Sequence, residues 1–180
     1  MPRRALKQFS RAFPQNAGKD GSWDGLGRML EQAKSIEAGD EVPAAAPGAP
    51  RLLVIDDDNL HRMIVCRVAA KAGYVPVAAG TYEEAAELAQ YGKFDCITLD
   101  LSLGAHGGAE LLRHFWVIGC KIPVIIISGA DDAVCRETVR IAKSLKFELV
   151  ESVPKPVDLS LLRFTLERFK QQQHQAASAA

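Results

Sequence analysis

Residues 94–108 read FDCITLDLSLGAHGG, in which an apolar run ends at a single aspartate, Asp100, and a glycine-rich stretch follows. A short, continuous apolar run with branched residues is typical of a strand that is covered on both faces of a parallel sheet. Glycines after such a run favour a loop. We therefore expect Asp100 at the carboxyl end of a buried strand, at one edge of a sheet.

The alternation of an apolar run with a helical pattern recurs about five times from residue 51 onward. The predicted strands have the sequences RLLVID (51–56), YVPVAAG (74–80), FDCITLD (94–100), IPVIIIS (122–128) and ELVESV (148–153). Between the second and third lies TYEEAAELAQYG, which opens with the capping-box spacing of Thr81 and Glu84. This order predicts an α/β fold, a doubly wound, five-stranded parallel sheet of the flavodoxin-like type, preceded by an N-terminal extension.

The composition divides the chain into four parts. Residues 1–37 form the extension, residues 38–50 a linker rich in proline and alanine, residues 51–170 the globular domain, and residues 171–180 a polar tail that we expect to be disordered. Within the extension, helical spacing of Trp23, Leu26, Leu30, Ala33 and Ile36 predicts a short amphipathic helix over about 22–37. Its apolar stripe could pack on its own domain, on a second copy or on a partner, and the sequence leaves these open.

The bulk composition narrows the range of partners. Basic and acidic residues are equal in number, 22 of each, so no nucleic acid is expected as a partner. No apolar run approaches the length of about 20 residues that a helix needs to span a bilayer, so no membrane segment is expected. The four cysteines are widely spaced and lack the CxxC pairing of zinc and redox sites, which predicts reduced thiols and a cytoplasmic protein.

Polar side chains follow four of the predicted strands. Because the carboxyl ends of parallel strands meet at one edge of a sheet, we expect these side chains to converge. They are Asp56, Asp57, Asp58, Asp100, Ser128 and Lys155. Taken singly, each has an ordinary alternative: Asp58 and Ser128 could cap helices, and Lys155 could be a solvated surface residue.

The combination points to phosphoryl chemistry. Two carboxylates about 4 Å apart repel by about 4 kcal/mol at an effective dielectric near 20, so several of them at one edge need a cation or shifted pKa values. A hard ion with oxygen ligands, Mg²⁺, suits such a cluster. A hydroxyl from Ser128 and a positive charge from Lys155 would complete the stabilisation of a transferring phosphoryl group. The predicted chemistry is aspartyl phosphate formation on Asp100.

These motifs resemble the receiver domain of bacterial two-component response regulators. The matching stretches are LLVIDDDNLHR (52–62), DCITLDLSLGAHGG (95–108), VIIISGADD (124–132) and VPKPVDL (153–159), in that order. The resemblance implies that Asp56, Asp57, Asp100 and the backbone carbonyl of Ser102 bind Mg²⁺. It also implies that Asp100 accepts phosphate from a sensor histidine kinase or a histidine phosphotransfer protein, that Ser128 and Lys155 contact the phosphoryl group, and that the Lys155–Pro156 bond is cis.

The resemblance also sets expectations for signalling. Leu60 and His61 lie on the first helix of the domain, where this family docks its kinase. Ser152 stands three residues before Lys155, where most receivers carry the switch tyrosine or phenylalanine, so signalling through an aromatic rotamer is in doubt. No output-domain motif follows, and we expect the receiver itself to act by protein binding, phosphate relay or homodimerisation. The dimer face would combine the helix at 131–146, the strand at 148–153 and the last helix.

Two other functions fit parts of the pattern. One is a receiver that acts by binding alone, without phosphorylation. The other is a phosphatase similar to the haloacid dehalogenases, with Asp56 as the nucleophile and Asp58 as the acid/base, but that assignment leaves Asp100 without a role. We expect a phosphoacceptor that is not an enzyme, apart from hydrolysis of its own aspartyl phosphate.

Overall fold

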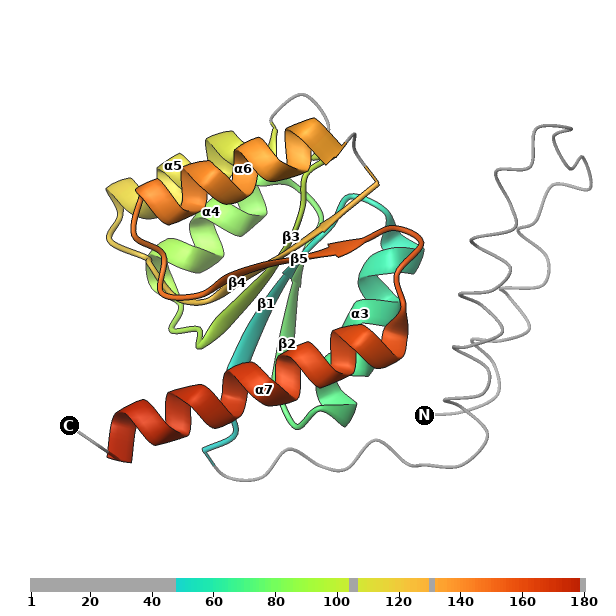
Figure 1. Cartoon of the computed structure of the whole chain (residues 1–180), viewed down its shortest axis with the longest axis vertical. Helices are drawn as coiled ribbons and strands as arrows, with labels where there is room; N and C mark the ends of the chain where they lie inside the picture. The colour runs from blue at the N-terminus through green and yellow to red at the C-terminus, as the bar shows by residue number, and fades with distance from the viewer. Residues whose placement is uncertain (1–47, 104–106, 130–131, 179–180) are drawn as a thin grey trace, which may run out of the picture.

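The computed structural model describes residues 48–103, 107–129 and 132–178, so the predicted helix at 22–37 and most of the linker lie outside it. Strands and helices alternate along the described chain, as Figure 1 shows. They are β1 (Arg51–Ile55), α3 (Asn59–Lys71), β2 (Val75–Ala79), α4 (Tyr82–Tyr91), β3 (Cys96–Asp100), α5 (Gly108–Val117), β4 (Val124–Ser128), α6 (Asp132–Ser144), β5 (Val150–Pro154) and α7 (Leu159–Ser178).

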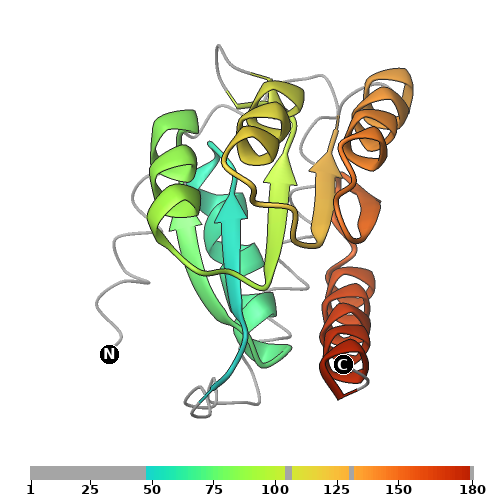
Figure 2. The same ribbon diagram turned by 90° about the vertical axis from the view of Figure 1, so that its left-hand side faces the viewer.

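The five strands form one parallel sheet in the order β2-β1-β3-β4-β5, which confirms the predicted doubly wound fold. Helices α3 and α7 cover one face and α4, α5 and α6 the other (Figures 1 and 2). Side chains alternate between the two layers: Leu52 and Val54 of β1 belong to the core under α3 and α7, and Leu53 and Ile55 to the core on the other face. Burial on both faces explains why β1, β3 and β4 read as continuous apolar runs.

Two helix starts follow the predicted capping chemistry. The Asp58 side chain accepts the backbone N–H groups of Leu60 and His61 and so caps α3. At α4, the N–H of Glu84 donates to Thr81 Oγ1 at 3.2 Å, while Glu84 Oε2 accepts the N–H of Gly80 at 2.7 Å. These caps fix where each helix leaves the carboxyl end of its strand.

The last helix is longer than predicted, and disorder from residue 171 is wrong as far as Ser178. The tail is rich in glutamine and alanine, which favour helix once a helix is started. Packing starts it: Phe169 is fully buried, Lys170 Nζ donates to the carbonyl of Ala72, and Gln173 Nε2 donates to the carbonyl of Asp95. Polarity alone was therefore a poor guide to the end of the domain.

Thr98 of β3 gives a first testable prediction. It is 1% exposed, and its Oγ1 has no hydrogen-bond partner among the described residues. A buried hydroxyl without a partner costs about 1–3 kcal/mol, and valine has the same shape without the hydroxyl. We expect Thr98→Val to raise the free energy of unfolding by about 1 kcal/mol in urea denaturation.

Thr138 provides the matched control, because its Oγ1 donates to the carbonyl of Val134 at 2.9 Å. Thr138→Val should lower the free energy of unfolding by about 1 kcal/mol. Equal losses in the two variants would mean that the Thr98 hydroxyl is satisfied in solution.

Candidate functional site

Three carboxylates meet at the carboxyl edge of the sheet. β1 and β3 are neighbours, and the pairing of Ile55 with Leu99 places Asp56 beside Asp100. One carboxylate oxygen from each of Asp56, Asp57 and Asp100 lies within 4.8 Å of the others. Asp56 and Asp100 are each only 2% exposed, whereas Asp57 is exposed. The structure thus brings together three of the four acids that the sequence predicted to converge.

Lys155 follows β5, and its side chain contacts two of the same carboxylates. Its N–H donates to the carbonyl of Ser128 at 2.9 Å, which ties the segment after β5 to the end of β4. Its Nζ lies 2.7 Å from Asp100 Oδ2 and 3.2 Å from Asp56 Oδ2. Burial would lower the pKa of Lys155, but hydrogen bonds and charge from the two aspartates outweigh it, and the pKa is raised. Lys155 is therefore a fixed cation, and its bond to Pro156 is cis as expected.

Asp56 is held on several sides. Its Oδ1 accepts the N–H of Asp58 at 2.9 Å, and His61 Nδ1 lies 3.6 Å from its Oδ2. Burial would raise the pKa of Asp56, but His61, the charge of Lys155 and the Asp58 N–H together keep it below its ordinary value of 3.8. The carboxylate is thus ionised over the whole physiological pH range.

The other predicted site residues lie on β4, on β5, on α3 and just after β3. Ser128 ends β4 and is 5% exposed. The Ser102 N–H donates to Asp100 Oδ1 at 3.2 Å, so Ser102 lies beside the nucleophile candidate. Ser152 is exposed on β5, and Leu60 is half-buried at the start of α3. The functional roles of these residues stay proposals.

Asp58 does not join the cluster. Its side chain caps α3, which was the ordinary alternative for this residue. The phosphatase interpretation needs Asp58 as an acid/base, yet its Oδ1 accepts N–H groups at 2.8 and 3.0 Å. Both oxygens of Asp56 and both oxygens of Asp100 have partners, so hydrogen bonding does not separate these two carboxylates as nucleophiles. The commitment of Asp58 to the cap of α3 is what counts against the phosphatase interpretation.

The charge balance of the cluster suits a divalent cation. Three carboxylates face one ammonium group, and the exposed Asp57 opens the cluster to solvent. Oxygen ligands of this kind fit a hard ion such as Mg²⁺, which keeps several of its waters. The acidic cluster can therefore hold a metal ion.

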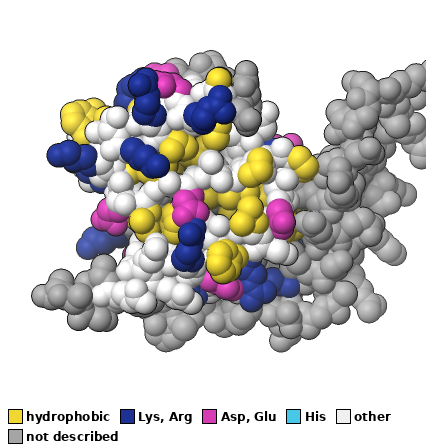
Figure 3. All heavy atoms as spheres, in the orientation of Figure 1, with side chains coloured by type: hydrophobic (Ala, Val, Ile, Leu, Met, Phe, Trp, Pro, Cys, Tyr) yellow, Lys and Arg dark blue, Asp and Glu magenta, His cyan; other side chains and the backbone are white. Residues whose placement is uncertain are grey.

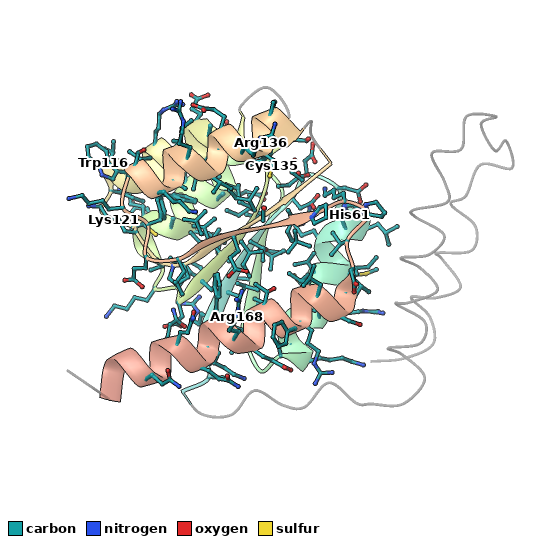
Figure 4. The ribbon with its side chains drawn as sticks, in the orientation of Figure 1. His61, Trp116, Lys121, Cys135, Arg136 and Arg168 are labelled. Atoms are coloured by element: carbon teal, nitrogen blue, oxygen red, sulfur yellow. The ribbon has the colours of Figure 1, made fainter. Side chains whose placement is uncertain are left out.

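The contacts that Arg62 and His61 make in this region were not predicted from the sequence. Arg62 Nη1 donates to the carbonyl of Asp56 at 2.5 Å, and Arg62 Nη2 donates to Asn59 Oδ1 at 3.1 Å. His61 was predicted only as a docking residue, yet it lies against Asp56 at the top of α3, near the segment after β5 (Figure 4). Both depend on how α3 is rotated over β1, which periodicity does not specify.

Known proteins are similar to this chain in sequence and fold. The family model for the response regulator receiver domain matches residues 52–167. The protein-glutamate methylesterase/protein-glutamine glutaminase of Archaeoglobus fulgidus is 36% identical over 123 residues, covering 66% of this chain and 34% of that protein. A response regulator receiver protein from Pseudomonas putida has a TM-score of 0.58 and 26% identity, over 67% of this chain and 97% of that one.

A more distant structure shares the fold. A response regulator protein from Burkholderia pseudomallei, with a phosphorylated aspartic acid, a calcium ion and citrate, has a TM-score of 0.56 and 24% identity, over 72% of this chain and 74% of that one. The chain spans about a third of the length of the first curated relatives it matches. Among the described residues, no helix is both long and apolar enough to cross a bilayer.

Proposed function

Because the chain belongs to the response regulator receiver domain family, we propose that it is a phosphoacceptor of two-component signalling in which Asp100 receives the phosphoryl group. The observation that carries the proposal is the 2.7 Å contact of Lys155 Nζ with Asp100 Oδ2, beside Asp56 and Asp57. The donor would be the phosphohistidine of a sensor histidine kinase or a histidine phosphotransfer protein. The esterase and glutaminase activities named for the relative from Archaeoglobus are not part of the proposal.

The proposed transfer moves the phosphoryl group from the donor histidine to Asp100 in one displacement step. A carboxylate oxygen of Asp100 forms the new O–P bond while the P–N bond of the donor breaks, and the donor histidine keeps the electron pair of that bond. Lys155 would then pair with a phosphoryl oxygen, and the Ser128 hydroxyl would donate to another. Mg²⁺ held by Asp56, Asp57, Asp100 and the carbonyl of Ser102 would neutralise the remaining phosphoryl charge.

A small phosphodonor tests this function directly. The full chain is incubated with acetyl phosphate and MgCl₂, and its intact mass is measured. We expect one phosphoryl adduct that does not form when EDTA replaces MgCl₂. The absence of an adduct under both conditions would favour the receiver that acts by binding alone.

The metal site gives a second prediction. Asp57→Asn removes one charged ligand, and we expect it to weaken Mg²⁺ binding by about tenfold or more in isothermal titration calorimetry. Asp58→Asn is the matched control, because asparagine also caps helices and Asp58 lies outside the cluster. Similar weakening in both variants would mean that Mg²⁺ binding depends on the total negative charge at this edge of the sheet and not on Asp57 as a ligand.

For signal output we propose the surface formed by α6, β5 and α7, called here the α6–β5–α7 face. We define it by side chains of these elements that are exposed or half-buried: Arg136, Arg140 and Lys143 of α6, Glu151 and Ser152 of β5, and Leu161, Phe164 and Arg168 of α7. β5 is an edge strand, so this face ends the sheet. It could bind a second copy or a target protein, and Ser152 would leave that contact without the switch aromatic of the family.

A further inference from the structure

The α6–β5–α7 face carries exposed apolar side chains. Phe164 is 62% exposed and Leu161 is 43% exposed, although both lie on a helix whose opposite side is fully buried. The guanidinium group of Arg168 lies 5.9 Å from the Phe164 ring and pairs with Glu151 of β5, so the ring is held close to the edge strand. Figure 3 shows hydrophobic side chains across the middle of this face.

The upper rim of the same face is basic. From Asp132, where α6 begins, to Lys146 the chain has four basic residues, Arg136, Arg140, Lys143 and Lys146, and two acidic residues, Asp132 and Glu137. Glu137 pairs with Arg140. Dark blue side chains gather along α6 in Figure 3, and Figure 4 shows Arg136 and Arg168 on opposite sides of β5. A partner for this face should therefore offer an apolar stripe flanked by acidic groups.

The chain itself contains a segment with these properties. Residues 20–41 hold six acidic and two basic residues, and their apolar residues Trp23, Leu26, Leu30, Ala33 and Ile36 recur at helical spacing. We propose that this acidic, apolar segment of the same chain docks on the α6–β5–α7 face. A helix packed there would set its apolar stripe against Leu161 and Phe164 and its carboxylates towards the rim of α6.

The connection is long enough for this contact. Ten residues separate Glu37 from Gly48, and an extended chain of that length spans about 35 Å. β1 begins at Arg51 and lies three strand positions from β5, a separation of about 15 Å in a parallel sheet. The high effective concentration provided by such a short tether favours docking within one chain over binding to a second copy. The docked segment would occupy the surface that the proposed signalling contacts need.

Tryptophan fluorescence of the full chain tests the proposal. The chain has two tryptophans, so Trp116→Phe leaves Trp23 as the only one. Docking predicts Trp23 emission at shorter wavelength than that of a solvated tryptophan. In this background Phe164→Glu should shift the emission to the solvated value, whereas Tyr91→Glu, at a 78% exposed aromatic residue of α4, should not. The proposal would be overturned if Trp116→Phe alone emitted at the wavelength of a solvated tryptophan, or if Phe164→Glu and Tyr91→Glu shifted the emission equally.

Charge and concentration provide two further readouts. Lys143→Glu should shift the emission towards the solvated value, and Lys93→Glu, an equal charge change at an exposed lysine before β3, should leave it unchanged. Equal shifts in Lys143→Glu and Lys93→Glu would mean that the basic side chains of α6 do not contribute to docking. Emission that returns to the solvated value on dilution, with a mass that falls from dimer to monomer in light scattering, would assign the segment to a second copy and overturn docking within one chain.

Discussion

Asp100→Asn should abolish the phosphoryl adduct that we expect the wild-type chain to form with acetyl phosphate and Mg²⁺. Asparagine occupies the same volume, but its amide is not a nucleophile towards phosphorus, so the loss should be complete rather than partial. The fold should survive, because the substitution removes a negative charge from a residue that is only 2% exposed and lies within 4.8 Å of two other acids. Intact mass measures the adduct, and circular dichroism during heating checks the fold.

Asp95→Asn is the matched control for this experiment. Asp95 is exposed and lies just before β3, where its Oδ2 accepts the N–H of Arg51. The adduct should form on this variant as on the wild type. An adduct that persists in Asp100→Asn would assign the chemistry to another residue.

Lys155→Ala should destabilise the metal-free protein by about 3 kcal/mol, because it leaves the carboxylates of Asp56 and Asp100 buried without their cation. The same variant should lower the rate of phosphorylation by about 10²-fold, as expected when one preorganised cationic donor is lost. Urea denaturation without Mg²⁺ measures the first effect, and the time course of the adduct in intact mass measures the second.

Two conditions should reduce the stability loss. Added Mg²⁺ replaces part of the missing positive charge. Acid should also reduce it: the pKa of Asp56 is lowered in the folded protein, so the stability from its ionised form is present above its ordinary value of 3.8 and is lost as pH falls through the lower folded value. Lys143→Ala is the control, since Lys143 is exposed on α6, and it should change stability little. A loss in Lys155→Ala that neither Mg²⁺ nor acid reduces would mean that packing, not charge, explains it.

Docking of residues 20–41 would connect the extension to these reactions. The α6–β5–α7 face includes β5, and Lys155 follows this strand directly. Contacts on the face and contacts at the acidic cluster therefore share one structural element. If phosphorylation moves β5 or the residues that follow it, the affinity of the α6–β5–α7 face for residues 20–41 would change. Docking of residues 20–41 would then change the equilibrium constant of phosphorylation by the same factor.

The fold was predictable because its signals are local. Burial on both faces makes β1, β3 and β4 continuous apolar runs. The capping box of Thr81 and Glu84 indicates the start of α4 within four residues. Even the weaker strand β2, which contains Pro76, fits its place at the sheet edge. The prediction of where α7 ends was wrong, because the length of this helix depends on contacts of Lys170 and Gln173 with segments far away in sequence.

The candidate site was predictable in outline for a topological reason. Side chains that follow parallel strands meet at one edge, so Asp56, Asp100 and Lys155 could be placed together before any distance was known. The sequence could not show that Lys155 contacts both acids, that Asp58 is committed to capping α3, or that Arg62 holds the carbonyl of Asp56. These features depend on side-chain direction and helix rotation, which are set by tertiary packing.

The most direct test of the central claim is the position of the phosphoryl group on the wild-type chain. After reaction with acetyl phosphate and Mg²⁺, borohydride reduction converts an aspartyl phosphate into homoserine, and peptide mass spectrometry locates the new residue. We predict homoserine at position 100 and at no other aspartate. Homoserine at position 56 or 57, or an adduct that survives reduction unchanged, would contradict the assignment of Asp100 as the phosphoacceptor.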